Sequence, residues 1–221
     1  MKKMLALVAV SSVLALASAG ASAQQSDRQL RAGQDYTVLA KSFPQEKGRL
    51  DVVYFFWYGS PWSREFDGMI RNWAAKNAPP QVRFSAVPAV IADEWGYGSR
   101  VFYALKAMGL DSQLSGPLMG AIQSGVVKYR NPSTLMAWLR ERGADTAKFA
   151  QVINSPLVKA QASSSPSATY LSGVQSVPAV LVGGKYLFTV SPNGDVADLM
   201  DKVNFAVEAN VREMELRQSK N

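Results

Sequence analysis

Residues 52–63 read VVYFFWYGSPWS, and this segment constrains how the rest of the chain can be arranged. Its first part, 52–58, is a continuous apolar and aromatic run of strand length, which is typical of a central strand covered on both faces. Ser60 is a favourable helix N-cap, and Pro61 suits the first helical position. The segment therefore predicts a buried strand that turns directly into a helix.

The residues that follow have helical spacing. Pro79 and Pro80 end this helix, and residues 82–87 then alternate apolar and polar positions, which predicts a strand. A strand, a helix and a second strand in this order favour parallel pairing of the two strands. The apolar positions of the helix are Phe66, Met69, Ile70, Trp73 and Ala74.

The middle of the chain has helical character and no strand pattern. The sequence SSSPS at 163–167 predicts an interruption, after which Tyr170 and Leu171 are expected to resume an apolar face. The helices are expected at 100–108, 114–125, 132–141, 146–154 and 156–163.

The last part of the chain predicts a hairpin and a long helix. Residues 179–182 (AVLV) and 185–190 flank a Gly183-Gly184 turn, and residues 196–215 form an amphipathic pattern. A short strand at 36–39 precedes the central one. The order of elements therefore indicates an α/β fold in which a helical block is inserted into a mixed sheet.

The N-terminus has the pattern of a secretory signal peptide. Lys2 and Lys3 precede an apolar run over 4–16, and Ala21-Ser22-Ala23 supplies small residues for cleavage after Ala23. The alternative is an uncleaved N-terminal anchor. No later segment is long and apolar enough to span a bilayer, so we expect no integral membrane segment after cleavage.

Composition excludes several kinds of chemistry. The chain of 221 residues contains no Cys and no His, so Ser–His catalysis, Cys–His catalysis and disulfide bonds are impossible within it. We expect no metal site and no cofactor. The net charge is +7, but Lys and Arg are scattered along the chain, so we expect no nucleic-acid partner.

The ordered set of motifs resembles the DsbA family of periplasmic thiol–disulfide oxidoreductases. Ser60-Pro61-Trp62-Ser63 stands where that family has Cys-Pro-His-Cys, and Val177-Pro178 stands where it has a Val before a cis-proline. The Gly183-Gly184-Lys185-Tyr186 hairpin also fits. The resemblance implies periplasmic localisation and a thioredoxin-like fold in two parts, 24–92 and 173–221, with an inserted helical domain at 93–172.

The same comparison implies that the family's chemistry is absent. Ser60 and Ser63 replace both cysteines, Trp62 replaces the middle His, and Tyr54 replaces a buried acid. A serine hydroxyl supplies no thiolate and cannot form a disulfide. We therefore expect a redox-inactive protein that is not an enzyme of this class. The changes at Tyr54 and Trp62 favour a natural loss over an engineered Cys→Ser exchange, which stays the alternative.

The resemblance also implies a retained peptide-binding surface at Trp62, Val177 and Pro178. In the family, the residue before the cis-proline offers its backbone to an extended peptide. Pro178 alternatively serves only to hold the fold. The expected partners are polypeptide clients, for a chaperone or adaptor, or an envelope protein, for a structural or assembly subunit. The sequence leaves the oligomeric state open.

Aromatic residues near Ser60 are candidates for a binding platform. Trp57 and Tyr58 are expected to face the core on the two sides of the strand, whereas Trp62 is expected to be exposed at the helix tip. The candidates are Trp57, Tyr58, Trp62, Trp95 and Tyr97.

Overall fold

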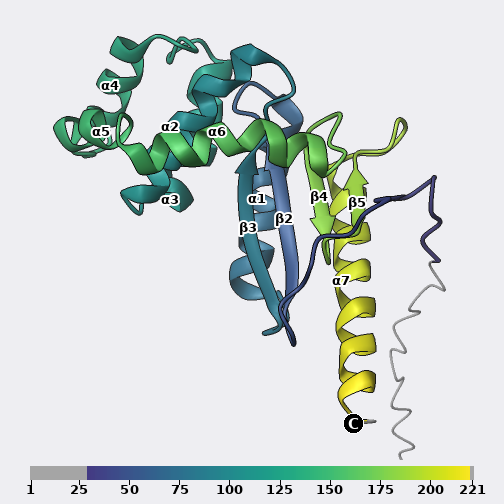
Figure 1. Cartoon of the computed structure of the whole chain (residues 1–221). Helices are drawn as coiled ribbons and strands as arrows, with labels where there is room; N and C mark the ends of the chain where they lie inside the picture. The colour runs from purple at the N-terminus through teal and green to yellow at the C-terminus, as the bar shows by residue number, and fades with distance from the viewer. Residues whose placement is uncertain (1–28, 220–221) are drawn as a thin grey trace, which may run out of the picture.

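The computed structural model describes residues 29–219 (Figure 1). The signal peptide predicted at 1–23 and its cleavage site lie outside the described residues. Within the described range, none of the helices is both long and apolar enough to cross a membrane.

A five-stranded mixed sheet forms the centre of the fold, with strand order β1-β5-β4-β2-β3. β2 pairs in parallel with β3, as the strand–helix–strand pattern predicts, and antiparallel with β4. β5 completes the hairpin with β4 and pairs with β1. The strands are β1 (Thr37–Val38), β2 (Leu50–Phe56), β3 (Val82–Pro88), β4 (Ala179–Val182) and β5 (Tyr186–Thr189).

Two helices cover one face of the sheet. Helices α1 (Pro61–Lys76) and α7 (Val196–Gln218) pack on the face that carries Tyr54 and Phe56. The indole N–H of Trp73 on α1 donates a hydrogen bond to Asn204 on α7, over 2.9 Å. Alternate residues of the central strands, such as Phe55, face a second, smaller core. The strand is therefore buried on both sides, as its unbroken apolar run predicts.

The inserted helices form a lobe beside the sheet, at the left of Figure 1. They follow a short 3₁₀ helix, Asp93–Trp95, and α6 runs from the lobe back toward β4. The domain boundaries at 92/93 and 172/173 stay predictions. The helices are α2 (Gly96–Ala107), α3 (Asp111–Gln123), α4 (Pro132–Glu141), α5 (Thr146–Val152) and α6 (Pro156–Leu171).

The interruption predicted at 163–167 is wrong, because α6 continues through Pro166. Ser165 is fully buried against α2, where its hydroxyl lies 2.8 Å from that of Ser99. This small-residue contact lets α2 and α6 approach closely, and tertiary packing overrides the local helix-breaking signal. Tyr170 and Leu171 also differ from expectation, since they are 83% and 60% exposed and face no core.

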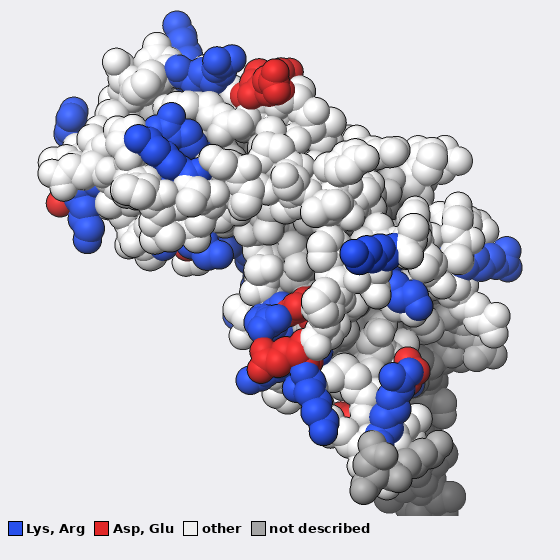
Figure 2. Space-filling model, viewed as in Figure 1, with Lys and Arg blue, Asp and Glu red and all other residues white. Residues whose placement is uncertain are grey.

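Charged side chains are dispersed over the surface. On the face shown in Figure 2, Lys and Arg lie on the helical lobe and on the sheet part, without gathering into one continuous patch. This distribution agrees with their scatter along the sequence.

Candidate functional site

Ser60 lies between β2 and α1 and caps the helix. Its backbone is extended, and its Oγ accepts a hydrogen bond from the Ser63 N–H at 3.1 Å. Its carbonyl accepts the Arg64 N–H at 3.1 Å, and Pro61 occupies the first helical turn. The capping roles that the sequence predicts for Ser60 and Pro61 are confirmed.

The Ser60 hydroxyl also reaches the loop before β4. It donates a hydrogen bond to the Val177 carbonyl over 3.4 Å, so residues 117 positions apart meet here. The Val177–Pro178 peptide bond is cis. Val177 is partly exposed and Pro178 is buried, whereas Trp62 is 48% exposed in the first turn of α1. The exposure predicted for Trp62 is confirmed.

Ser63 lies directly beneath this cap and is fully buried. Its Oγ accepts the Trp57 N–H at 3.3 Å, and its carbonyl accepts the Tyr54 hydroxyl at 3.0 Å. Both serines therefore act as hydrogen-bonding groups of the turn. Since the chain contains no cysteine, neither position supplies a thiolate.

Tyr54 belongs to a buried aromatic cluster that includes residues of β2 and α1. Its ring lies 5.5 Å from those of Phe56 and Phe66. Burial raises the pKa of Tyr54 well above its usual value of 10, and the negative charge on Asp67 raises it further. The phenol therefore stays protonated at neutral pH, where it donates its hydrogen bond to the Ser63 carbonyl.

Asp67 is a buried acid that sequence reasoning missed. It is 3% exposed on α1, and its carboxylate accepts the Arg71 Nε–H at 2.9 Å. Burial raises its pKa, and the adjacent Arg71 charge opposes that shift. The Asp–Arg pair one helical turn apart, beside the apolar positions Phe66 and Ile70, could have revealed this residue.

Gln123 was also absent from the predicted site. Its side-chain amide extends from the end of α3 and donates to the Ser60 carbonyl at 3.0 Å and, more weakly, to the Tyr58 carbonyl at 3.5 Å. The helical lobe thus holds the turn that carries Ser60. A single glutamine in a helix gives no sequence signal for such a contact.

Three of the five candidate aromatic residues belong to one cluster, and its role as a binding platform stays a prediction. Trp57 lies beyond the end of β2, partly exposed, and stacks on Trp95 with ring centroids 4.2 Å apart. Tyr129 meets the Trp57 ring edge-on at 6.2 Å, and Tyr97 packs against Tyr129. The core-facing orientation expected for Tyr58 is confirmed, whereas that expected for Trp57 is wrong. The chain turns at 57–59, which takes Trp57 out of the strand.

The chemistry of the site is limited by these residues. No cluster of three or more His, Cys, Asp or Glu within 29–219 could hold a metal ion. The site consists of the capped N-terminus of α1, the Val177 carbonyl in the loop beside it, and the exposed indole of Trp62.

Comparison with known proteins identifies the protein family to which this chain is similar. The model of the DSBA-like thioredoxin domain matches residues 87–204. The chain is 28% identical to the thiol:disulfide interchange protein DsbA of Pseudomonas aeruginosa, across 90% of this chain and 94% of that protein. The DsbA of Burkholderia cepacia is 30% identical, across 84% of this chain and 86% of that protein.

Solved structures agree with the sequence relatives. The crystal structure of Pseudomonas aeruginosa DsbA superposes with a TM-score of 0.76 at 27% identity, covering 87% of this chain and 97% of that one. The Neisseria meningitidis oxidoreductase NmDsbA3 gives a TM-score of 0.70 at 26% identity, covering 86% and 100%. The chain has the thioredoxin-like DsbA fold and belongs to the DsbA-like thiol:disulfide interchange family, with serine at both positions expected to carry cysteine.

Proposed function

We propose that this protein is a redox-inactive member of the family that binds extended or unfolded polypeptide in the periplasm, as a chaperone or adaptor. One observation carries the proposal. The Ser60 hydroxyl and the Val177 carbonyl are held 3.4 Å apart beside the exposed Trp62, in a chain that has no cysteine.

The loss of redox chemistry follows from the atoms available. Thiol–disulfide exchange needs a thiolate that attacks a disulfide sulfur, and a second thiol that resolves the mixed disulfide. Here both positions carry oxygen, and both hydroxyls are engaged in the turn. Tyr54, where the family has an acid, keeps its proton at neutral pH. The site therefore lacks the nucleophile and the resolving group, and Tyr54 does not replace the acid as a proton acceptor.

Two features of the site support the proposed binding of a peptide. Val177, the residue before Pro178, is partly exposed, and its carbonyl lies beside the N-terminus of the helix that carries Trp62. An extended peptide can pair with backbone groups of such a loop, and an indole is a strong anchor for an apolar side chain. Localisation in the periplasm rests on the signal-peptide pattern at 1–23 and on the family's role in disulfide interchange.

The test compares three forms of the mature chain: wild type, Trp62→Ser, and Leu216→Ser as a matched control. Leu216 is 62% exposed near the end of α7, so its substitution removes a similarly exposed apolar group elsewhere. We expect wild type to leave insulin disulfides intact, to bind an unfolded-client peptide and to slow the aggregation of a reduced client. Trp62→Ser should weaken peptide binding about tenfold or more, and Leu216→Ser should not.

The outcomes separate the competing functions. Insulin reduction by wild type would contradict redox inactivity. Absence of peptide binding together with absence of any effect on aggregation would refute the chaperone proposal. Capture of a stable envelope partner that is indifferent to Trp62→Ser would instead support the structural or assembly role.

A further inference from the structure

The helical lobe contains a cavity of about 310 Å³, lined by residues of α2, α4 and α5 and of the turn that follows α5. Its apolar lining includes two buried side chains, Leu135 and Phe149, and two partly exposed ones, Met136 and Ile153. The cavity therefore reaches from the core of the lobe to its surface. Neither of the site residues Ser60 and Trp62 belongs to its lining.

Among the described residues that line the cavity, Arg100 alone carries a formal charge. Its Nη2 group donates to the Ile153 carbonyl at 3.3 Å and to the Asn154 side-chain oxygen at 2.9 Å. Both acceptors are neutral, and no carboxylate of the described residues forms an ion pair with this guanidinium.

The two hydrogen bonds use only part of what Arg100 can donate. A guanidinium carries five N–H groups. The Nε–H of Arg100 is buried without an acceptor, and its Nη1 group makes no hydrogen bond within residues 29–219. Arg100 thus holds the end of α5 while its positive charge has no counterion and its Nη1 group stays available.

The other polar side chains of the cavity can also donate. Burial raises the pKa of Tyr97 above its usual value of 10, against the opposing charge of Arg100, so its hydroxyl keeps its proton at neutral pH. That hydroxyl makes no hydrogen bond to another described residue. Asn154 donates one amide N–H to the Ala150 carbonyl at 3.0 Å and keeps a second. The cavity therefore offers a positive charge with N–H and O–H donors.

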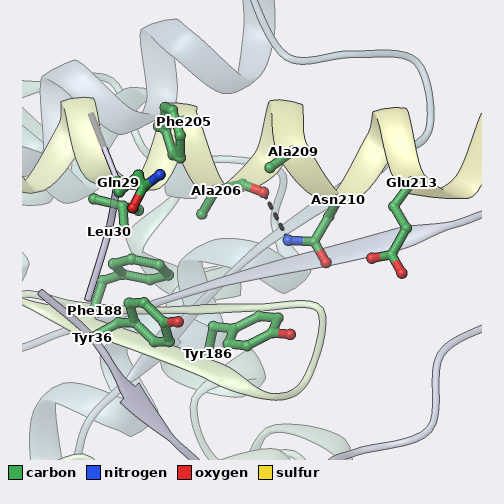
Figure 3. A pocket seen from close by; sticks show the side chains of 10 residues that line it. All are labelled: Gln29, Leu30, Tyr36, Tyr186, Phe188, Phe205, Ala206, Ala209, Asn210 and Glu213. Atoms are coloured by element: carbon green, nitrogen blue, oxygen red, sulfur yellow. Dashed lines mark hydrogen bonds between the residues drawn. The ribbon is translucent and has the colours of Figure 1, made fainter. Parts of the chain in front are cut away.

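The groove between α7 and β5 lacks this property (Figure 3). Its charged residue, Glu213, is exposed and already pairs with Arg217 one turn further along α7. An exposed ion pair of this kind provides no uncompensated charge that would select a ligand. This groove therefore serves as an internal control for the cavity of the lobe.

We propose that the cavity of the lobe binds a small organic acid with an apolar body. The carboxylate would accept hydrogen bonds from Arg100 and Tyr97, and the apolar body would lie against Leu135, Met136 and Phe149. The volume lies at the small end of the range of natural ligand sites. Residues 93–172 include eight Lys and Arg against five Asp and Glu, which further favours an anion.

The probe for the test is 3-phenylpropionate. Two near-isosteric compounds replace its anionic group, 3-phenylpropionamide by a neutral one and 3-phenylpropylamine by a cation. NMR titration of the isotope-labelled mature chain should give a dissociation constant of about 1 mM or tighter for the carboxylate. The amide should bind about tenfold more weakly, because it loses the charge-assisted hydrogen bond to Arg100, and the amine more weakly still.

Two pairs of variants locate the binding. Ala150→Leu fills the cavity from an exposed position of α5 and should abolish binding of 3-phenylpropionate, whereas Ala209→Leu makes the same change in the groove of Figure 3 and should not. Arg100→Gln should weaken carboxylate binding about tenfold and amide binding far less, a difference that a merely distorted lobe would not produce. Arg140→Gln removes an equal charge from an exposed position of α4 outside the cavity and should leave both affinities unchanged.

Three results would overturn the proposal: no binding of 3-phenylpropionate by wild type, equal affinity for carboxylate and amide, or undiminished carboxylate binding in Ala150→Leu or Arg100→Gln. The comparison of ligands on wild type decides the question even if Arg100→Gln does not fold. Because Trp62 does not line the cavity, Trp62→Ser should bind 3-phenylpropionate normally, so the two proposals can fail separately.

Discussion

Replacing Ser60 by alanine tests whether the helix cap also supports the Val177 loop. The Ser60 hydroxyl accepts the Ser63 N–H at 3.1 Å and donates to the Val177 carbonyl at 3.4 Å. Ser155 provides an internal comparison, since it caps a second 16-residue helix that also begins with proline. Its hydroxyl accepts the Val158 N–H at 3.3 Å.

The two substitutions should lower the free energy of unfolding by different amounts. Loss of a serine N-cap destabilises a protein by about 1 kcal/mol, so Ser155→Ala should lower the free energy of unfolding by about that amount. Ser60→Ala loses the cap and also the contact with Val177. A hydrogen bond contributes about 0.5–1.5 kcal/mol, and the 3.4 Å length places this one at the lower end. We therefore expect a total of about 1.5–2 kcal/mol for Ser60→Ala.

Equilibrium urea unfolding of the mature chain measures the difference directly. The midpoint should fall for both variants while the m-value stays constant, which shows that the folded and unfolded states are otherwise comparable. In thermal unfolding, each 1 kcal/mol corresponds to about 2–4 °C for a domain of this size. If Ser60→Ala costs no more than Ser155→Ala, the contact between Ser60 and Val177 contributes nothing, and the reasoning is refuted.

Three further predictions follow from the same region. Burial raises the pKa of Asp67 in the folded state. The protonated side chain therefore contributes fully to the free energy of unfolding below about pH 4, and this contribution is lost as the pH rises through the folded-state pKa. In urea unfolding between pH 4 and 7, wild type should accordingly lose stability relative to Asp67→Asn. A constant difference across that range would contradict this assignment. The Ser60→Cys/Ser63→Cys double variant should form a reducible disulfide. After reduction, the pH dependence of alkylation should give the thiol at position 60, at the helix N-terminus, an apparent pKa below the ordinary 8.5. An ordinary value would show that the helix end no longer stabilises an anion. Gly59→Ala would place a methyl group 2.5 Å from the Trp57 ring and should destabilise the protein by about 1–3 kcal/mol with loss of near-ultraviolet circular dichroism, whereas an unchanged spectrum would disprove this contact.

Much of the fold can be predicted from the sequence because its signals are local and strong. The apolar run over 52–58, the Ser60-Pro61 cap and the Gly183-Gly184 turn each specify an element through backbone preferences that act within a few residues. Their order then restricts the topology to few choices. The central strand, the parallel β2–β3 pair and the hairpin all follow from such signals.

The parts that the sequence did not reveal depend on contacts between distant segments. Trp57 leaves the strand because the chain turns there to meet Trp95, and Gln123 reaches Ser60 from the inserted lobe. Pro166 stays helical because Ser165 packs against α2. In each case the deciding interaction joins residues far apart in sequence, so no local pattern could have indicated it.

The pairing of β2 with β4 has a consequence for how the chain acquires its structure. Val52 pairs with Val182, and the whole helical lobe is synthesised between them. The contacts within the lobe, including that between α2 and α6, involve only residues that precede β4, whereas the sheet must wait for its fourth strand. Until then β2 has one unpaired edge on an apolar strand, the kind of edge that promotes aggregation. A chain truncated before residue 179 would therefore not be a smaller version of this protein but one with an open, association-prone sheet.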